Sequence, residues 1–222
     1  MSSSTVVAVI ITTAVLLIAG IGLSTYYTAN LYAQLNPEID AVKSIFKLIA
    51  SNALSGYLIN MPIYLKYGYL KFEDSGIFSI SLDGQQLFAS KILTLTYVCR
   101  FNIYPEDEPV ILVSCNSSGF SYVIVGIGNR IKLKFYPKFL FNDGQVVVAC
   151  VVFDAMDIQF VGDSLELNYH ICVVERYLAP LYNVGFLLRV VYGDSVSCFV
   201  VNASALSPVL VSVKVVKVRV EG

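Results

Sequence analysis

The eighteen residues from Val6 to Leu23 constrain this chain more than any other stretch. The run VVAVIITTAVLLIAGIGL contains no charge, and the first charged side chain of the whole sequence is Glu38. A helix needs about 20 mainly apolar residues to cross about 30 Å of hydrocarbon, so this run with its uncharged flanks is long enough. Tyr26 and Tyr27 follow it, where aromatic rings would lie at the level of lipid headgroups. The sequence therefore predicts a membrane anchor.

Two other interpretations of this run are a buried core helix and a cleaved secretion signal. A secretion signal is expected to carry a basic residue before the apolar run and a small-x-small cleavage site after it. The opening MSSST has no Lys or Arg, and no clean Ala-x-Ala follows Leu23, so an uncleaved anchor is the preferred interpretation. The side chains expected to face lipid or neighbouring helices are Val6, Val9, Ile10, Val15, Leu16, Leu17, Ile18, Ile21 and Leu23.

A second helical pattern follows the apolar run. Apolar residues recur at steps of three and four, which is typical of a helix with one face packed on another surface. This stripe consists of Tyr32, Leu35, Ile39, Val42, Phe46, Ile49 and Ala53. Asn36 and Pro37 are typical of a helix start, so we expect a kink or a second helix there. The helix should end near Ser55-Gly56.

From Pro62 onward the apolar period becomes two, which is typical of β-strands. Residues 131, 133 and 135 are bulky and alternate with Lys132 and Lys134, and Asp83-Gly84 has the composition of a hairpin turn. The run Val146 to Phe153 is apolar on both faces and should be a central strand. About nine or ten strands and no further helix are expected. The predicted fold class is therefore α+β, with a helical segment over residues 1–58 and an all-β sandwich of Ig-like or Greek-key type over residues 59–222.

The last strand-like run, VLVSVKVVKVRV, changes its apolar face part of the way along. The residues Val209, Val211, Val213 and Val215 share one face, and Val216, Val218 and Val220 share the other. A one-residue slip of this kind predicts a β-bulge. The cations of this run would protect an exposed edge strand, unless the strand pairs within the domain or with a neighbouring subunit.

The charge content excludes one class of partner and favours another. A net charge of −1 gives no electrostatic basis for nucleic-acid binding. Only 14% of the residues are charged, against about 25% in an average soluble chain. We therefore expect neighbouring subunits to cover part of the surface.

Five cysteines and two sequons bear on the compartment. The cysteines have no metal-type spacing, and either buried free thiols or one or two disulfides in an exported domain would account for them. They are Cys99, Cys115, Cys150, Cys172 and Cys198. The candidate N-glycosylation sites Asn116 and Asn202 fit an extracytoplasmic domain.

The sequence contains little that resembles catalytic machinery. The only histidine, His170, lies in a strand-like run, and a hydrogen-bonded strand residue is its simplest interpretation. The acidic cluster Glu106 to Glu108 could bind calcium weakly, but a solvated loop explains it better. Tyr64, Tyr67 and Tyr69 form the densest group of tyrosines and could be either strand packing or a sugar-binding face. We predict no enzyme activity, no cofactor and no metal site.

The layout of the first 58 residues resembles the archaeal type IV pilin superfamily, which includes archaellins, adhesion pilins and archaellum accessory proteins. A short polar start leads into an uncharged apolar helix, which continues as an amphipathic helix into a β-rich domain. No Lys or Arg precedes Val6, whereas that family has a basic residue and a peptidase site there. This departure points to an accessory or minor pilin as much as to a major one.

The resemblance implies a structural subunit without bond chemistry. Its apolar helix would leave the membrane to form a filament core, and its β-domain would form an outer sheath that contacts other subunits, the S-layer or a surface glycan. The implied localisation is the cell surface, as an extracellular filament anchored in the membrane before assembly. The alternatives are a single-span surface protein whose sandwich binds an S-layer, a glycan or a partner without polymerising, and a viral or envelope structural protein.

Overall fold

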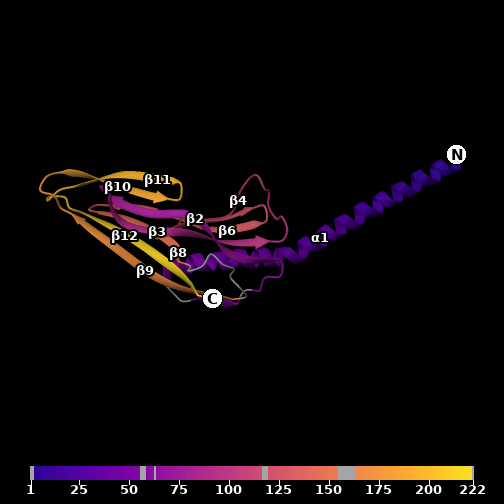
Figure 1. Cartoon of the computed structure of the whole chain (residues 1–222), viewed down its shortest axis with the longest axis horizontal. Helices are drawn as coiled ribbons and strands as arrows, with labels where there is room; N and C mark the ends of the chain where they lie inside the picture. The colour runs from indigo at the N-terminus through magenta and orange to yellow at the C-terminus, as the bar shows by residue number, and fades with distance from the viewer. Residues whose placement is uncertain (1–2, 56–58, 63, 117–119, 155–163, 222) are drawn as a thin grey trace. The chain divides into compact units, whose positions relative to one another are not determined.

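The computed structural model describes residues 3–55, 59–62, 64–116, 120–154 and 164–221. These residues form one α-helix, α1 (Ser3–Ser55), and twelve β-strands (Figure 1). The chain divides into two compact units, residues 1–42 and residues 43–222. The predicted boundary at 58/59 corresponds to the change from helix to strand. The second compact unit begins earlier, since it includes the last turns of α1.

Helix α1 is continuous through Pro37. The prediction of a second helix starting there is wrong. Proline removes one backbone hydrogen bond and crowds the preceding turn, but the residues on both sides favour a helix and the loss at one position does not end it. The helix ends at Ser55, which confirms the end predicted from the sequence.

Seven strands form an entirely antiparallel sheet in the order β11-β10-β2-β3-β6-β5-β4. Their bounds are β2 Gly68–Leu82, β3 Gln85–Cys99, β4 Val110–Asn116, β5 Ser121–Ile127, β6 Arg130–Tyr136, β10 Val184–Tyr192 and β11 Ser195–Ala203. The predicted hairpin at Asp83-Gly84 joins β2 to β3, and both residues have positive φ, of 48° and 80°. Positive φ at both central residues is the requirement of a type I′ turn, which suits the twist of paired strands.

Five strands form the second sheet, in the order β1-β9-β12-β8-β7. Their bounds are β1 Ile59–Pro62, β7 Lys138–Asn142, β8 Gln145–Asp154, β9 Ser164–Leu178 and β12 Val209–Glu221. Strands β8 and β12 run parallel, and the other pairs of this sheet are antiparallel. The chain passes from one sheet to the other at Pro137, between β6 and β7. Because this proline divides one strand-like run in two, it contributes to a strand number above the nine or ten predicted.

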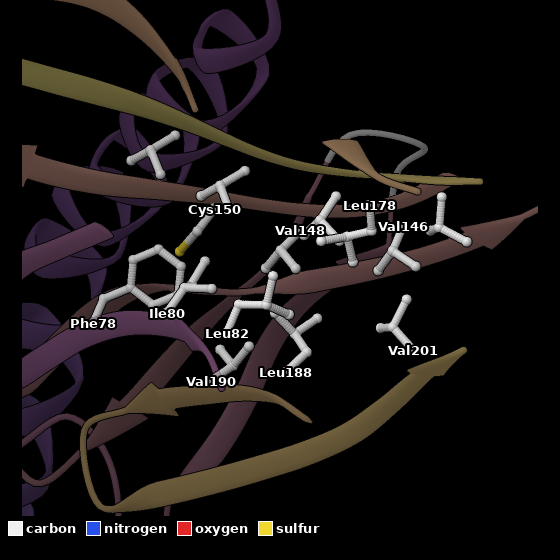
Figure 2. Packing of buried hydrophobic residues seen from close by; sticks show 14 of the residues in the cluster. Phe78, Ile80, Leu82, Val146, Val148, Cys150, Leu178, Leu188, Val190 and Val201 are labelled. Atoms are coloured by element: carbon white, nitrogen blue, oxygen red, sulfur yellow. The ribbon is translucent and has the colours of Figure 1, made fainter. Parts of the chain in front are cut away.

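The two sheets pack face to face over an apolar core (Figure 2). Phe78, Ile80 and Leu82 of β2 lie opposite Val148 and Cys150 of β8. The alternation predicted for residues 131–135 is confirmed, because Ile131, Leu133 and Phe135 are buried and the lysines between them are not. The predicted central position of Val146 to Phe153 is also confirmed, since β8 lies between β12 and β7. These observations establish the α+β class with a sandwich-like β-domain.

The last turns of α1 lie against the five-stranded sheet. Phe46, Ile49, Ala50 and Ala53 are buried. Ala53 lines an apolar cavity of about 210 Å³ together with residues of β7, β8, β9 and β12. The sheet therefore has one face in the sandwich core and part of its other face under the helix.

Strand β12 has no β-bulge, so the bulge predicted from its sequence is wrong. Its pairing with β8 and with β9 continues without a register shift over all described pairs. Val213 and Val215 belong to the core between the sheets, whereas Val216 lines the cavity beside Ala53. The apolar face changes because the two ends of a straight strand are covered by different layers. The strand is internal to the sheet, so its cations do not protect an edge.

Candidate membrane and assembly surfaces

The apolar part of α1 exposes its side chains along its whole length. Val9, Ile10, Val15, Leu16, Leu17, Ile18, Ile21 and Leu23 are each more than half exposed, whereas the side chain of Val6 lies outside the described residues. By length and composition, α1 contains one segment able to cross a membrane, and no part of the tested window is buried. Exposed apolar surface of this extent is unfavourable in water, and the segment is suited to a bilayer or to contact with other helices.

Three threonine hydroxyls in this segment and just beyond it are satisfied inside the helix. The hydroxyls of Thr13, Thr25 and Thr28 each donate to the carbonyl oxygen four residues earlier, at 2.8 Å. In lipid an unpaired hydroxyl is costly because no water is present to bind it. The segment is therefore suited to an apolar environment despite its threonines.

Gly20 and Gly22 leave two open positions on the apolar segment. Apart from the adjoining residues and the backbone of the same helix turns, no atom of the chain lies within 4 Å of a Cβ built at either residue. In lipid, small residues let two helix backbones approach closely. These positions could therefore accept a neighbouring helix without rearrangement of this one.

The helical stripe is buried at most of its positions. Leu35, Ile39 and Val42 are buried, as are Phe46 and Ile49 in the second unit. Tyr32 is the exception, with 44% of its surface exposed. The first residue of the stripe is thus accessible, and the rest have the burial expected of a packed face.

Glu73 on the outer face of the seven-stranded sheet binds three cations from two strands. Its carboxylate lies 2.8 Å from Nζ of Lys71, 2.8 Å from Nζ of Lys132 and 3.1 Å from Nη1 of Arg130. The hydroxyl of buried Thr96 donates to it at 3.2 Å. Burial favours the neutral acid, but hydrogen bonds from Lys132 and Lys71 and their charges outweigh it and lower the pKa of Glu73 to about 2. This group joins β2, β3 and β6 on the side opposite the core.

Sequence reasoning did not identify this ion cluster. Residues 71 and 73 are far from residues 130 and 132 along the chain, and the register of β2, β3 and β6 brings them together. The alternation of Lys132 and Lys134 indicated only that this face is solvated. The partners of the lysines depended on strand order, which no local pattern specifies.

The five cysteines are free thiols in the structure. Cys99 and Cys150 are buried, and burial raises the pKa of the Cys150 thiol well above its usual range. Cys198 is the exposed one, in β11. Of the two interpretations of the cysteines, the structure therefore agrees with free thiols, and none of these five residues forms a disulfide.

The two candidate glycosylation residues are exposed. Asn116 ends β4, and its Oδ1 accepts a hydrogen bond from Ser121 at 3.1 Å. Asn202 lies near the end of β11 with its side chain in solvent. Both side chains are accessible, and their glycosylation stays a prediction.

Aromatic side chains lie in the segments that connect β1 to β2 and β3 to β4. Tyr64 is 87% exposed, and the rings of Tyr67 and Phe101 have centroids 6.4 Å apart. The ammonium of Lys66 lies 5.1 Å from the centroid of the Tyr67 ring. Exposed aromatic faces of this kind are suited to ligands with apolar and polar sides, of which a sugar is one.

His170 is exposed on β9, opposite Lys217 of β12. Among the described residues, no group of three or more His, Cys, Asp or Glu is arranged to hold a metal ion. No family model, curated protein or solved structure matches this chain.

Proposed function

We propose that this chain is a structural subunit of an archaeal type IV pilus-like surface filament. Its N-terminal helices would form the filament core, and its β-domains would form the outer sheath and contribute to adhesion. The main support is the uncharged apolar part of α1, whose side chains from Val9 to Leu23 are exposed. The same helix continues without a break into turns that are buried in a β-sandwich unit.

The physical basis of assembly is the exchange of one apolar environment for another. In the membrane, lipid covers the side chains from Val9 to Leu23. In a filament, neighbouring copies of the same helix would cover them, with the open surface at Gly20 and Gly22 allowing close approach. Neither environment requires a charge or a metal, so the function involves no bond chemistry.

The charge-poor surface of the β-domain adds support. Exposed apolar side chains lie on both sheets, including Ile171 and Val173 of β9 and Val196 and Val200 of β11. Soluble monomers rarely expose large apolar patches. Subunits packed side by side in a sheath would cover such surfaces.

The alternative function is a single-span surface protein whose sandwich binds an S-layer, a glycan or a partner without polymerising. Exposed Tyr64 and the ring pair of Tyr67 and Phe101 favour this alternative, because aromatic rings with a polar edge are suited to ligands such as sugars. In this case α1 would remain in lipid.

The variant Tyr32→Lys separates the two functions. Tyr32 is accessible and lies beyond the apolar run, so a charge there leaves the anchor intact. In a filament core the same charge would be buried without a partner, which is strongly unfavourable. We expect Tyr32→Lys to retain the protein in membranes and to abolish filaments, while the control Tyr32→Phe assembles normally. Filaments of normal number and length from Tyr32→Lys would contradict the filament function.

A further inference from the structure

Strand β11 is an unprotected edge of the seven-stranded sheet. It is nine residues long and, among the described residues, pairs only with β10. Figure 1 shows it as the outermost strand of its layer. Its sequence, SVSCFVVNA, contains no charge, no proline and no glycine, and its pairing with β10 has no register shift. Natural edge strands usually carry a charge, a proline or a bulge, because a bare edge recruits another strand.

The other edges of the two sheets have such protection. Strand β4 has a register shift between Ile111 and Val113. Strand β7 is five residues long and begins with Lys138, and β1 is four residues long and ends with Pro62. Strand β11 therefore differs from every other edge of the described sheets, and its lack of protection suggests that another strand covers it.

The strand is paired with β10, which is itself tied to the hairpin turn at Asp83 and to β2. The backbone N–H of Leu187 in β10 donates to Oδ1 of Asp83 at 2.7 Å, and the N–H of Asp83 donates to the carbonyl of Leu187 at 2.9 Å. At the other end of the hairpin, the N–H of Gly193 donates to the carbonyl of Ile77 at 3.0 Å. A rigid edge loses little conformational freedom when a second strand joins it.

The side chains of β11 are complementary to those of a second β11 in antiparallel orientation. With a two-fold axis at Cys198, Val196 of each copy lies opposite Val200 of the other, and Asp194 lies opposite Asn202. No like charges meet, and valines that are 52% and 67% exposed in one copy become cross-strand apolar pairs. Such an isologous contact closes on two copies.

We propose that β11 pairs antiparallel with β11 of a second copy of this chain, with Cys198 at the two-fold axis. This inference goes beyond filament assembly. A helical filament is built from head-to-tail contacts, so an isologous β11 contact would join two filaments, or two anchored subunits, side by side. It holds or fails whether or not the apolar helices polymerise.

The test uses the full-length protein in detergent micelles and the thiol of Cys198 as a reporter. Antiparallel partners lie at about the Cα separation that a disulfide requires. Mild oxidation by copper phenanthroline in air, which transfers two electrons and two protons from the thiol pair to oxygen, should therefore give a linked dimer. The dimer should be lost in Cys198→Ser.

A charge-swap experiment identifies the partner. The double variant Val196→Lys/Val200→Lys places lysine opposite lysine, and Val196→Glu/Val200→Glu places glutamate opposite glutamate. Each should form at least about tenfold less linked dimer alone, and an equal mixture of the two should restore it. The matched control Val110→Lys/Ile111→Lys changes two exposed residues of β4, the opposite edge of the same sheet, and should leave the dimer unchanged.

Four results would overturn the proposal. The first three are a wild-type protein without a Cys198-linked dimer, a dimer that survives in the lysine variant, and a mixture that fails to restore the dimer. The fourth is a different polypeptide that copurifies from native membranes through β11, in place of a second copy. The restoration by mixing shows that the two charged variants are folded.

Discussion

The phenolic oxygen of Tyr169 on β9 donates a hydrogen bond of 3.3 Å to the carbonyl oxygen of Ile49 in α1. Burial raises the pKa of Tyr169, so the hydroxyl remains protonated and can donate at any physiological pH. This bond joins the last turns of the helix to the five-stranded sheet.

Tyr169→Phe should lower the free energy of unfolding by about 1 kcal/mol, because it removes one part-buried hydrogen bond and keeps the ring. Chemical denaturation of the full chain in detergent measures it. The control Tyr177→Phe lies on the same strand and is 65% exposed, and it should have almost no effect. Equal effects of the two variants would show that the contact contributes nothing.

Ile80 and Ile77 provide a matched pair on β2. Ile80 is fully buried in the core between the sheets, whereas Ile77 is 59% exposed on the other face. Ile80→Ala should lower the free energy of unfolding by about 2–5 kcal/mol, since it leaves a cavity in a closed core. Ile77→Ala should change it by less than about 0.5 kcal/mol. A reversed order in denaturant titrations would show that the sandwich faces are assigned wrongly.

Glu73 should make stability depend on pH in acid. Its pKa falls from 4.5 to about 2 on folding, so its contribution is fully present above pH 4.5 and is lost as the pH falls toward 2. Glu73→Gln should lower the free energy of unfolding at pH 7 by about 1–2 kcal/mol, a range reduced for solvent screening of its partners. The same variant should also reduce the fall in the free energy of unfolding between pH 4.5 and 2.

The control for this prediction is Asp74→Asn. Asp74 pairs with Lys91 at 2.8 Å, but both side chains are about half exposed. An exposed pair contributes little, so this variant should keep the acid decline. If Glu73→Gln keeps the full fall in the free energy of unfolding between pH 4.5 and 2, another carboxylate causes that fall.

Filament assembly should depend on the size of the side chain at position 20, where the chain has Gly20. Apart from the helix's own adjoining backbone, no atom of this chain lies within 4 Å of a Cβ at this position, so Gly20→Ala and Gly20→Leu should both insert into membranes normally. If neighbouring helices approach closely here, Gly20→Leu should reduce the yield of sheared filaments about tenfold or more and Gly20→Ala should have a smaller effect. Electron microscopy of sheared material measures the yield. Equal yields from both variants would exclude a close helix contact at this residue.

Local sequence patterns predicted the helix, strands and turns of this fold better than they predicted which elements pack or pair with one another. The positive φ values of Asp83 and Gly84 follow from a short-range turn preference, and the end of α1 at Ser55 follows from the end of the apolar stripe. The straight course of β12 could not be predicted in the same way. Its change of face depends on which layer covers each end, and that is a property of the whole domain.

The candidate surfaces also differ in whether consecutive residues or distant strands form them. The exposed apolar segment from Val9 to Leu23 was evident because a membrane span is specified by consecutive residues. The ion cluster at Glu73 and the edge position of β11 arise from strand order, which brings together residues far apart in sequence. A pattern such as SVSCFVVNA indicates a strand but not whether that strand has one neighbour or two.

The most direct test of the filament function is the isolation of the native protein from both cell membranes and material sheared from the cell surface, followed by cryo-electron microscopy. We predict that the sheared fraction contains the protein in filaments whose core is made of the apolar helical segments from Val6 to Leu23 of many copies. Recovery only as detergent-soluble monomers from the membrane fraction, with no filaments in the sheared fraction, would contradict it.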